Sequence, residues 1–323
     1  MKPIRIILAA AVGLLLVATG ATQAPAAWPE REIRLIVPYK AGGQSDLTAR
    51  KLAEIIQKRK LLPQPVIVVN IPGANTQEGL RAAMQAKPDG YTLLLHHSAF
   101  VTMKALGQIP MNWRDMEMIG QALEMGNSLV VNKDAPFATA EEFIGAVQAN
   151  PGKYRIAIPG LGGVAHLALL DVLARKGILD KVEIIPFDGA NEAVTALMGG
   201  RVDMRTAPNT DMARFVKSGD QRALLVMGND RLDGVEVAQY APDLGLENAL
   251  VLRNGIFAPS GLPEEIRAQL ATALRQAVES EDFQQFAAQQ AAKGRFLDAA
   301  QWAKVFEDDE KLVDSIVSHI VKK

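Results

Sequence analysis

Residues 33–46 read IRLIVPYKAGGQSD. The apolar, β-branched run at 33–37 predicts a buried strand, and the two glycines before a polar group predict a tight turn that opens a helix. A second stretch of this kind, IPGLGGVAH, occupies residues 158–166. A helix start presents unpaired N–H groups and the positive end of the helix dipole, so either turn can hold an anion. Two such turns facing one cleft predict a binding site between two lobes.

Apolar strands alternate with helical segments along most of the chain. Helical spacing of apolar residues follows the first strand, and breaks at Pro63 and Pro88 separate the next elements. This alternation is typical of α/β proteins in which helices cover both faces of mainly parallel sheets. Strands are expected at residues 33–37, 66–69, 91–95, 128–131, 154–158, 182–185 and 222–226.

The C-terminal third has the pattern of packed helices. Pro263 suits a first helical turn, and Asp298 with Gln301 resembles a capping box that opens a last helix. That helix carries Trp302 and Phe306 on one apolar stripe. We expect these helices to cover their own sheet rather than a partner.

The N-terminus has the features of a secretory signal. Lys2 and Arg5 precede an apolar stretch at residues 6–18 that is too short to span a membrane comfortably, and small residues follow up to Ala26. We therefore expect a cleaved signal peptide at residues 1–26 and a periplasmic mature protein. The chain contains no cysteine, which excludes disulfides and thiolate chemistry. A net charge of −1 makes nucleic acid an improbable partner.

No catalytic or metal motif stands out. The chain lacks a Gly-x-Ser-x-Gly elbow, a phosphate loop and a complete dinucleotide fingerprint. His96 and His97 are adjacent in a predicted strand, where neighbours point to opposite faces and cannot chelate one metal together. We expect no catalytic residue, no metal and no cofactor. His97, beside Ser98 at the end of the strand, is a candidate for the cleft, with a hydrogen-bonded loop histidine as the alternative.

Asp46, His166 and Arg205 can each serve either as a ligand contact or as a structural residue. Asp46 is interpreted as a helix cap, because a carboxylate repels an anion and suits first-turn N–H groups. His166, just after the second turn, is interpreted as an anchor for that turn. Arg205 follows a predicted strand and can either grip a carboxylate or form an ion pair with Asp203.

Six collinear segments carry a family resemblance across nearly the whole mature chain. They are IRLIVPYKAGGQSDLTAR at 33–50, VVNIPGA at 68–74, PDGYTLLL at 88–95, GLGGVAHLA at 160–168, GGRVD at 199–203 and FAPSGLP at 257–263. Together they resemble the solute-binding proteins of tripartite tricarboxylate transporters, the Bug or TctC family. The resemblance implies a type II periplasmic-binding-protein fold that closes over a small carboxylate and delivers it to a membrane permease.

The resemblance also implies a site and a domain division. It places Gly43, Gln44 and Ser45 on one side of the ligand and Gly162 and Gly163 on the other. With these we include as candidate ligand-binding residues Tyr39, His97, Ser98, Gly160, Val164, Asp188 and Arg205. The first lobe is expected at 27–125 and again at 227–323, the second at 126–226, and crossing hinge strands near 128–131 and 222–226. We expect a monomer.

Departures from the family pattern affect the ligand. His96 and His97 stand where the family often has glycine with a small hydroxyl residue, and Val164 replaces another hydroxyl residue. We therefore expect a larger or less polar acid, such as an aromatic or extended dicarboxylate. Two alternatives remain: a ligand-sensing partner of a membrane receptor kinase, and a secreted carboxylate-processing enzyme that would use His97 with a carboxylate partner.

Overall fold

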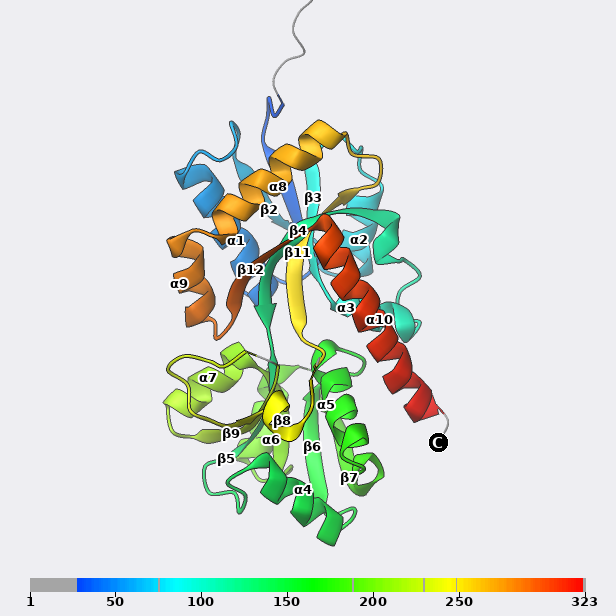
Figure 1. Ribbon diagram of the computed structural model, residues 1–323, viewed down its shortest axis with the longest axis vertical. Helices are drawn as coiled ribbons and strands as arrows, with labels where there is room; N and C mark the ends of the chain where they lie inside the picture. The colour runs from blue at the N-terminus through cyan, green and yellow to red at the C-terminus, as the bar shows by residue number, and fades with distance from the viewer. Residues whose placement is uncertain (1–27, 75, 188, 229, 248, 322–323) are drawn as a thin grey trace, which may run out of the picture.

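The computed structural model describes residues 28–321 apart from 75, 188, 229 and 248. The expected signal peptide lies outside these residues. Figure 1 shows two lobes stacked along the long axis of the molecule, each with a sheet flanked by helices. The expected two-lobed α/β architecture is confirmed. No helix within the described residues is long and apolar enough to cross a membrane.

The first lobe contains a six-stranded sheet in the order β12-β4-β11-β3-β1-β2. β1 is parallel to β2 and β3, whereas β11 is antiparallel to β3 and β4, and β12 is antiparallel to β4. Its strands are β1 (Ile33–Val37), β2 (Val66–Asn70), β3 (Thr92–His97), β4 (Met116–Met125), β11 (Leu252–Pro259) and β12 (Lys293–Asp298). Its helices are α1 (Gln44–Lys58), α2 (Gln77–Met84), α3 (Ala99–Ala105), α8 (Glu264–Val278), α9 (Glu281–Gln289) and α10 (Ala299–Val321), with a short 3-10 turn at Trp113–Asp115.

The second lobe repeats this plan with the order β10-β9-β5-β8-β6-β7. β6 is parallel to β7 and β8, while β5 is antiparallel to β8 and β9. Its strands are β5 (Asn127–Asn132), β6 (Tyr154–Pro159), β7 (Val182–Phe187), β8 (Met204–Pro208), β9 (Gln221–Met227) and β10 (Val237–Tyr240). Its helices are α4 (Ala140–Ala149), α5 (Val164–Arg175), α6 (Ala190–Met198) and α7 (Asn209–Lys217), with 3-10 turns at Leu179–Lys181 and Ala241–Leu244.

The expected return to the first lobe after residue 226 is wrong. β10 pairs in parallel with β9, with Val237 opposite Ala223, so the chain stays in the second lobe beyond that point. It re-enters the first sheet only with β11. The expected hinge segment at 222–226 is therefore an internal strand of the second lobe. The C-terminal third also contains a strand, β12, which the helical pattern did not indicate.

The other crossing between the lobes runs from β4 through Gly126 into β5. A side chain at Gly126 would lie 3.1 Å from Asn209 Nδ2 and 3.2 Å from the Met227 carbonyl oxygen, so the crossing is closely packed. One apolar cluster continues from the first lobe into the second and joins Phe100 and Phe257 with Val164 and Leu167. This continuity places the two lobes in contact along one side.

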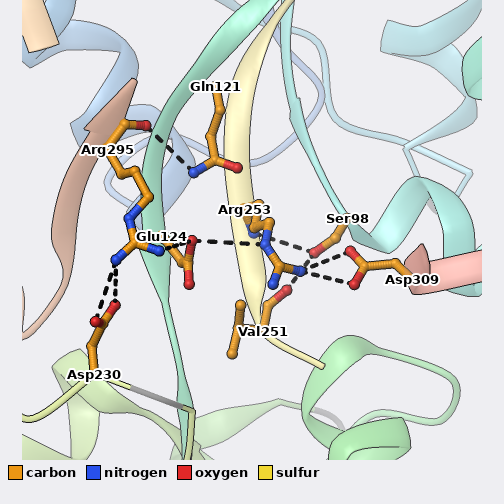
Figure 2. A network of polar contacts seen from close by, with 8 residues as sticks. All are labelled: Ser98, Gln121, Glu124, Asp230, Val251, Arg253, Arg295 and Asp309. Atoms are coloured by element: carbon orange, nitrogen blue, oxygen red, sulfur yellow. Dashed lines mark hydrogen bonds and ion pairs between the residues drawn. The ribbon is translucent and has the colours of Figure 1, made fainter. Parts of the chain in front are cut away.

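An ion cluster joins the lobes beside the crossing. Asp230 follows β9, and its neighbours Arg231 and Leu232 bind the second lobe through Asp243 and the Tyr240 hydroxyl. Two cations of β12 in the first lobe reach Asp230, Lys293 Nζ at 2.8 Å and Arg295 at 3.1 Å. Figure 2 shows the Arg295 contact and its continuation to Glu124.

The last helix begins at the expected capping box. The Asp298 N–H donates to Gln301 Oε1 at 3.2 Å, and the Gln301 N–H donates to Asp298 Oδ1 at 2.9 Å. Trp302 and Phe306 are fully buried, and both rings contact Phe257 of β11. α10 therefore packs against β11, the strand by which the chain re-enters the first sheet (Figure 1).

Candidate ligand-binding site

The first glycine turn links the C-terminal end of β1 to α1. Gly42 has a positive φ of 82°, and Gly43 is extended and forms the N-cap of α1. The Gly42 N–H donates to Asp46 Oδ2 at 2.8 Å, and the same carboxylate pairs with Arg50 and accepts from Asn70. Asp46 therefore fastens the turn. The interpretation of Asp46 as a helix cap is wrong, because its backbone donor is the Gly42 N–H, which precedes the helix, and the N-cap position is Gly43 without a side-chain bond.

The charge of Asp46 is maintained by these contacts. Burial acts to raise its pKa, but the bonds from Arg50, Gly42 and Asn70 outweigh it and bring the pKa below its usual value. A carboxylate that stays ionised here preserves the acceptor that the Gly42 N–H requires.

Side chains at the start of α1 are fixed by a strand of the same lobe. Ser45 Oγ donates to Asn254 Oδ1 at 3.2 Å, and Asn254 Nδ2 donates to Gln44 Oε1 at 2.9 Å. Asn254 lies in β11 and is fully buried. Sequence reasoning missed it, and the available signal was an amide residue directly before the apolar run at residues 255–259. The backbone N–H groups of Gln44 and Ser45 donate to no acceptor among the described residues.

The second glycine turn links β6 to α5 with the same backbone. Gly162 has a φ of 79°, and Gly163 is the extended N-cap, with φ −72° and ψ 167°. The Gly162 N–H donates to His166 Nδ1 at 3.0 Å. His166 thus takes the place that Asp46 has in the first turn. Burial lowers the pKa of His166, so the ring is neutral at neutral pH and Nδ1 is an acceptor.

Side chains contribute less to this turn. Val164 is buried in the apolar cluster, and Gly160, with φ 95°, has open space around it. The N–H groups of Val164 and Ala165 donate to no acceptor within the described part of the chain. The second turn therefore offers backbone N–H groups, rather than polar side chains, as donors.

The second turn touches the first lobe. A Cβ atom at Gly162 would collide with the side chain of Gln108 and lie 2.7 Å from Leu106 Cδ1. Gln108 Nε2 also donates to the Leu161 carbonyl at 3.4 Å. Both Leu106 and Gln108 follow α3, so the two lobes approach each other at this turn.

Tyr39, His96 and His97 form one aromatic cluster at the end of β3. The expectation that the two histidines point to opposite faces is wrong, because their ring centroids lie 5.1 Å apart. Tyr39 contacts both rings and is stacked on His97 at 5.1 Å with an interplanar angle of 8°. The strand ends at His97 and α3 begins at Ala99, so the backbone turns there and strict alternation is lost.

Burial keeps this cluster uncharged. It lowers the pKa of His96 to about 4 and the pKa of His97 well below the usual value, and it raises that of Tyr39. His97 Nδ1 accepts from the Ala99 N–H at 3.1 Å, and His96 Nδ1 accepts from the His97 N–H at 2.8 Å. The residues the structure describes contain no group of three or more potential metal ligands.

Two expected ligand contacts are occupied by the protein itself. Ser98 Oγ donates to the Val251 carbonyl at 2.8 Å and accepts from the Arg253 N–H, as Figure 2 shows. Arg205 is fully buried and bonds to Asp211 Oδ2 at 2.6 Å and to Gln221.

The expected pairing of Arg205 with Asp203 is also wrong. Asp203 instead accepts from the Arg155 N–H at 2.8 Å. The Ser98 hydroxyl and the Arg205 guanidinium are therefore already bonded within the protein. Asp188 lies outside the described residues.

Two larger cavities lie apart from the turns. One of about 510 Å³ is lined by residues such as Lys133, Lys153 and Asp203 in the second lobe. The other, of about 480 Å³, lies between α5 and α10 and is lined by Arg175, among others. Neither includes a residue of the two glycine turns, so neither competes with them as the site that joins the lobes.

Two α/β lobes, each with a glycine turn that opens a helix, have the architecture of two-lobed solute-binding proteins. The chain matches the family described as "Tripartite tricarboxylate transporter family receptor" over residues 48–321, and it belongs to this family of periplasmic solute-binding proteins. A protein of Cupriavidus necator, "UPF0065 protein in gbd 5'region", is 30% identical over 317 residues, covering 97% of this chain and 95% of its own.

Solved structures show the same fold. A TctC solute-binding protein from Polaromonas superposes with a TM-score of 0.78 at 28% identity, covering 90% of this chain and 99% of that one. MatC from Rhodopseudomonas palustris, a structure with bound malate, superposes with a TM-score of 0.72 at 24% identity, covering 90% of this chain and 100% of that one. The latter comparison establishes the shared fold.

Proposed function

We propose that this protein captures a small carboxylate between its two glycine turns and delivers it to the membrane permease of a tripartite transporter. One observation carries the proposal. Gly42–Gly43 and Gly162–Gly163 have the same backbone conformation, one in each lobe, and each precedes helix N–H groups that lack an acceptor in the described chain. Membership in a receptor family for tricarboxylate transport supports an anionic ligand.

The proposed mechanism is closure of the lobes on the ligand. A carboxylate first docks at the start of α1 or α5, where the amide donors and the helix dipole favour negative charge. The second turn then completes its coordination. Only contacts made with both lobes at once favour the closed arrangement. The bond from Gln108 to the Leu161 carbonyl, which joins the second turn to the first lobe, supports this mechanism.

Native mass spectrometry of the purified protein, followed by calorimetric titration, tests the proposal. The panel contains aliphatic monocarboxylates, dicarboxylates and aromatic carboxylates, with neutral sugars and amines as controls. We expect micromolar binding of at least one acid, which corresponds to roughly −8 kcal/mol. Binding confined to sugars or cations would refute the proposal. Recovery of the bound acid unchanged after long incubation distinguishes a receptor from an enzyme.

Delivery requires a separate experiment in the native host. Periplasmic fractionation tests the expected location, and crosslinking of the ligand-loaded protein identifies its membrane partner. Capture of a tripartite permease supports a transport role. Capture of a receptor kinase in its place would assign the protein to sensing instead.

A further inference from the structure

His97 lies beside the first glycine turn. It pairs with Asn254 across the antiparallel strands β3 and β11, and its ring stacks on Tyr39, which lies three residues before Gly42. Asn254 in turn binds Gln44 and Ser45 at the start of α1. His97 is therefore next to the first glycine turn on two sides, through the Tyr39 ring and through Asn254.

The hydrogen bonds of His97 determine which ring nitrogen carries the proton. Nδ1 accepts from the Ala99 N–H at 3.1 Å, so in the neutral ring the hydrogen is on Nε2. Burial and the neighbouring His96 both favour the neutral form. His97 Nε2–H is thus a donor.

That donor has no partner among the residues that the structure describes. The side chain is 8% exposed, and no acceptor for Nε2 is found in the described part of the chain. Nε2 is not among the described side-chain atoms that are fully enclosed and lack a hydrogen bond, and the ring lies against Tyr39 at the start of the first glycine turn. An almost buried N–H without an acceptor is unfavourable in a folded protein, which points to an acceptor supplied from outside.

The ring cannot easily turn to find an acceptor elsewhere. Tyr39 is stacked flat on it, and the bond from Ala99 fixes its opposite edge. The donor direction is consequently built into the fold. Both histidines of this cluster are uncharged at neutral pH. The first lobe therefore offers an uncharged N–H donor at this point.

We infer that His97 Nε2–H donates to a second oxygen acceptor of the ligand, separate from the carboxylate held by the amides of the turns. This inference rests on the proposed function and narrows its ligand class. It favours acids that carry a further carboxylate, carbonyl or hydroxyl oxygen over monocarboxylates of equal size.

Matched pairs of acids test the inference by calorimetric titration. Suitable pairs are succinate with butyrate, adipate with hexanoate, and terephthalate with 4-methylbenzoate. For the pair of the fitting length, wild type is expected to prefer the first member by about ten- to hundredfold. His97→Phe keeps an aromatic ring for Tyr39 but removes the donor, and should reduce this preference to within about threefold. His97→Gln retains an amide donor and should keep part of the preference.

His166→Gln is the matched control in the other turn. It removes an imidazole from the protein without touching the proposed second contact, and should weaken both members of a pair alike. If wild type binds no acid at all, the proposed function fails. If wild type binds both members equally, or His97→Phe weakens both by the same factor, the inference is overturned while the proposed function stands.

Nitrogen NMR of wild type provides a readout that needs no variant to fold. The His97 ring should show a protonated Nε2 and an unprotonated Nδ1, and the Nε2 resonance should shift on addition of the preferred acid. A ring protonated at Nδ1, or an Nε2 resonance unmoved at saturation, would contradict the assignment.

Discussion

The two glycine turns share a backbone but differ in what surrounds it. Both place a positive-φ glycine before an extended N-cap glycine, and both fasten the first glycine N–H to a side chain four residues later. In the first turn that side chain is a carboxylate with three partners, and Gln44 and Ser45 are further tied to Asn254. In the second it is one imidazole, and the first two helical residues, Val164 and Ala165, have apolar side chains. The backbone that the two turns share can bind any carboxylate. We therefore expect the contacts that distinguish one acid from another to come from the first lobe.

The largest effect is expected from a side chain at Gly162. Gly162→Val combines a β-branched residue at φ 79° with a collision against Gln108 and Leu106 across the lobe boundary. We expect calorimetric affinity for the ligand to fall by more than about a hundredfold, since both the turn and closure are disturbed.

Gly152→Val is the matched control. Its φ of 78° is almost the same, but open space surrounds it and it lies in the turn before β6, away from both glycine turns. It should lose folding stability and keep its affinity. Gly42→Val, with φ 82° and no neighbour within 4 Å, should fall between the two. Wild-type affinity in Gly162→Val would remove the second turn from the site.

Replacing Asp46 or His166, the side chains that accept from the first glycine of each turn, should lower the free energy of unfolding by different amounts. Asp46→Ala leaves the Gly42 N–H without its acceptor, removes one of the two acceptors of the Asn70 amide and breaks the ion pair with Arg50. We expect the free energy of unfolding in urea to fall by about 2–3 kcal/mol. His166→Ala removes one bond from a half-buried ring and should cost about 1 kcal/mol. Equal losses would mean that the first turn gains nothing from its additional partners.

What the sequence could predict was local. The glycine turns, the capping box at Asp298 and Gln301, and the role of His166 as an anchor depend on residues within a few positions of one another. Asn254 and Asp211 were missed as partners, because strand register and helix placement bring them to Ser45 and Arg205. The strands β4, β10, β11 and β12 were missed. β10 and β12 are short and partly exposed, whereas β4 is rich in Met, Glu and Ala, which favour helix, and β11 contains Arg, Asn, Gly and Pro.

His96 and His97 show where a prediction from strand alternation fails within the site. Alternation predicts opposite faces for neighbours in a strand, but β3 ends at His97 and the alternation ends with it. The signal that could have indicated this was Ser98 with the helical spacing of the apolar residues that follow. A chemical consequence of the packed pair, its resistance to protonation, is testable.

Acid should destabilise the protein through its buried histidines. His96 has a pKa of about 4 in the folded protein, against about 6.5 when unfolded. Between these values the unfolded chain binds the extra proton, so stability falls as pH falls through this window, by about 1.4 kcal/mol per pH unit for one such group. Urea unfolding of wild type and His96→Gln from pH 7 to pH 4 measures this loss, which should be smaller in the variant.

The comparison of variants is needed because Asp309 acts in the opposite sense. Burial raises its pKa to about 6 despite the adjacent Arg253, so the folded protein gains stability from its protonation as pH falls between 6 and 4. Asp309 is present in both proteins and cancels in their difference. Asp46, whose pKa is lowered, adds its own loss only below its unfolded value of about 4. Parallel stability profiles for wild type and His96→Gln would contradict the neutral state assigned to His96.

The smallest effect is expected where the lobes are joined by charge rather than by the turns. Asp230→Asn removes the carboxylate that Lys293 and Arg295 share across the lobe boundary, in positions that are all partly exposed. Such pairs contribute little, so ligand affinity should fall by only about twofold at low salt, and the difference should vanish near 1 M salt. Asp308→Asn removes a carboxylate that is likewise paired with two cations, Lys304 and Lys311, but within α10. It should leave affinity unchanged. If both substitutions had the same effect, the charge across the boundary would not contribute to closure.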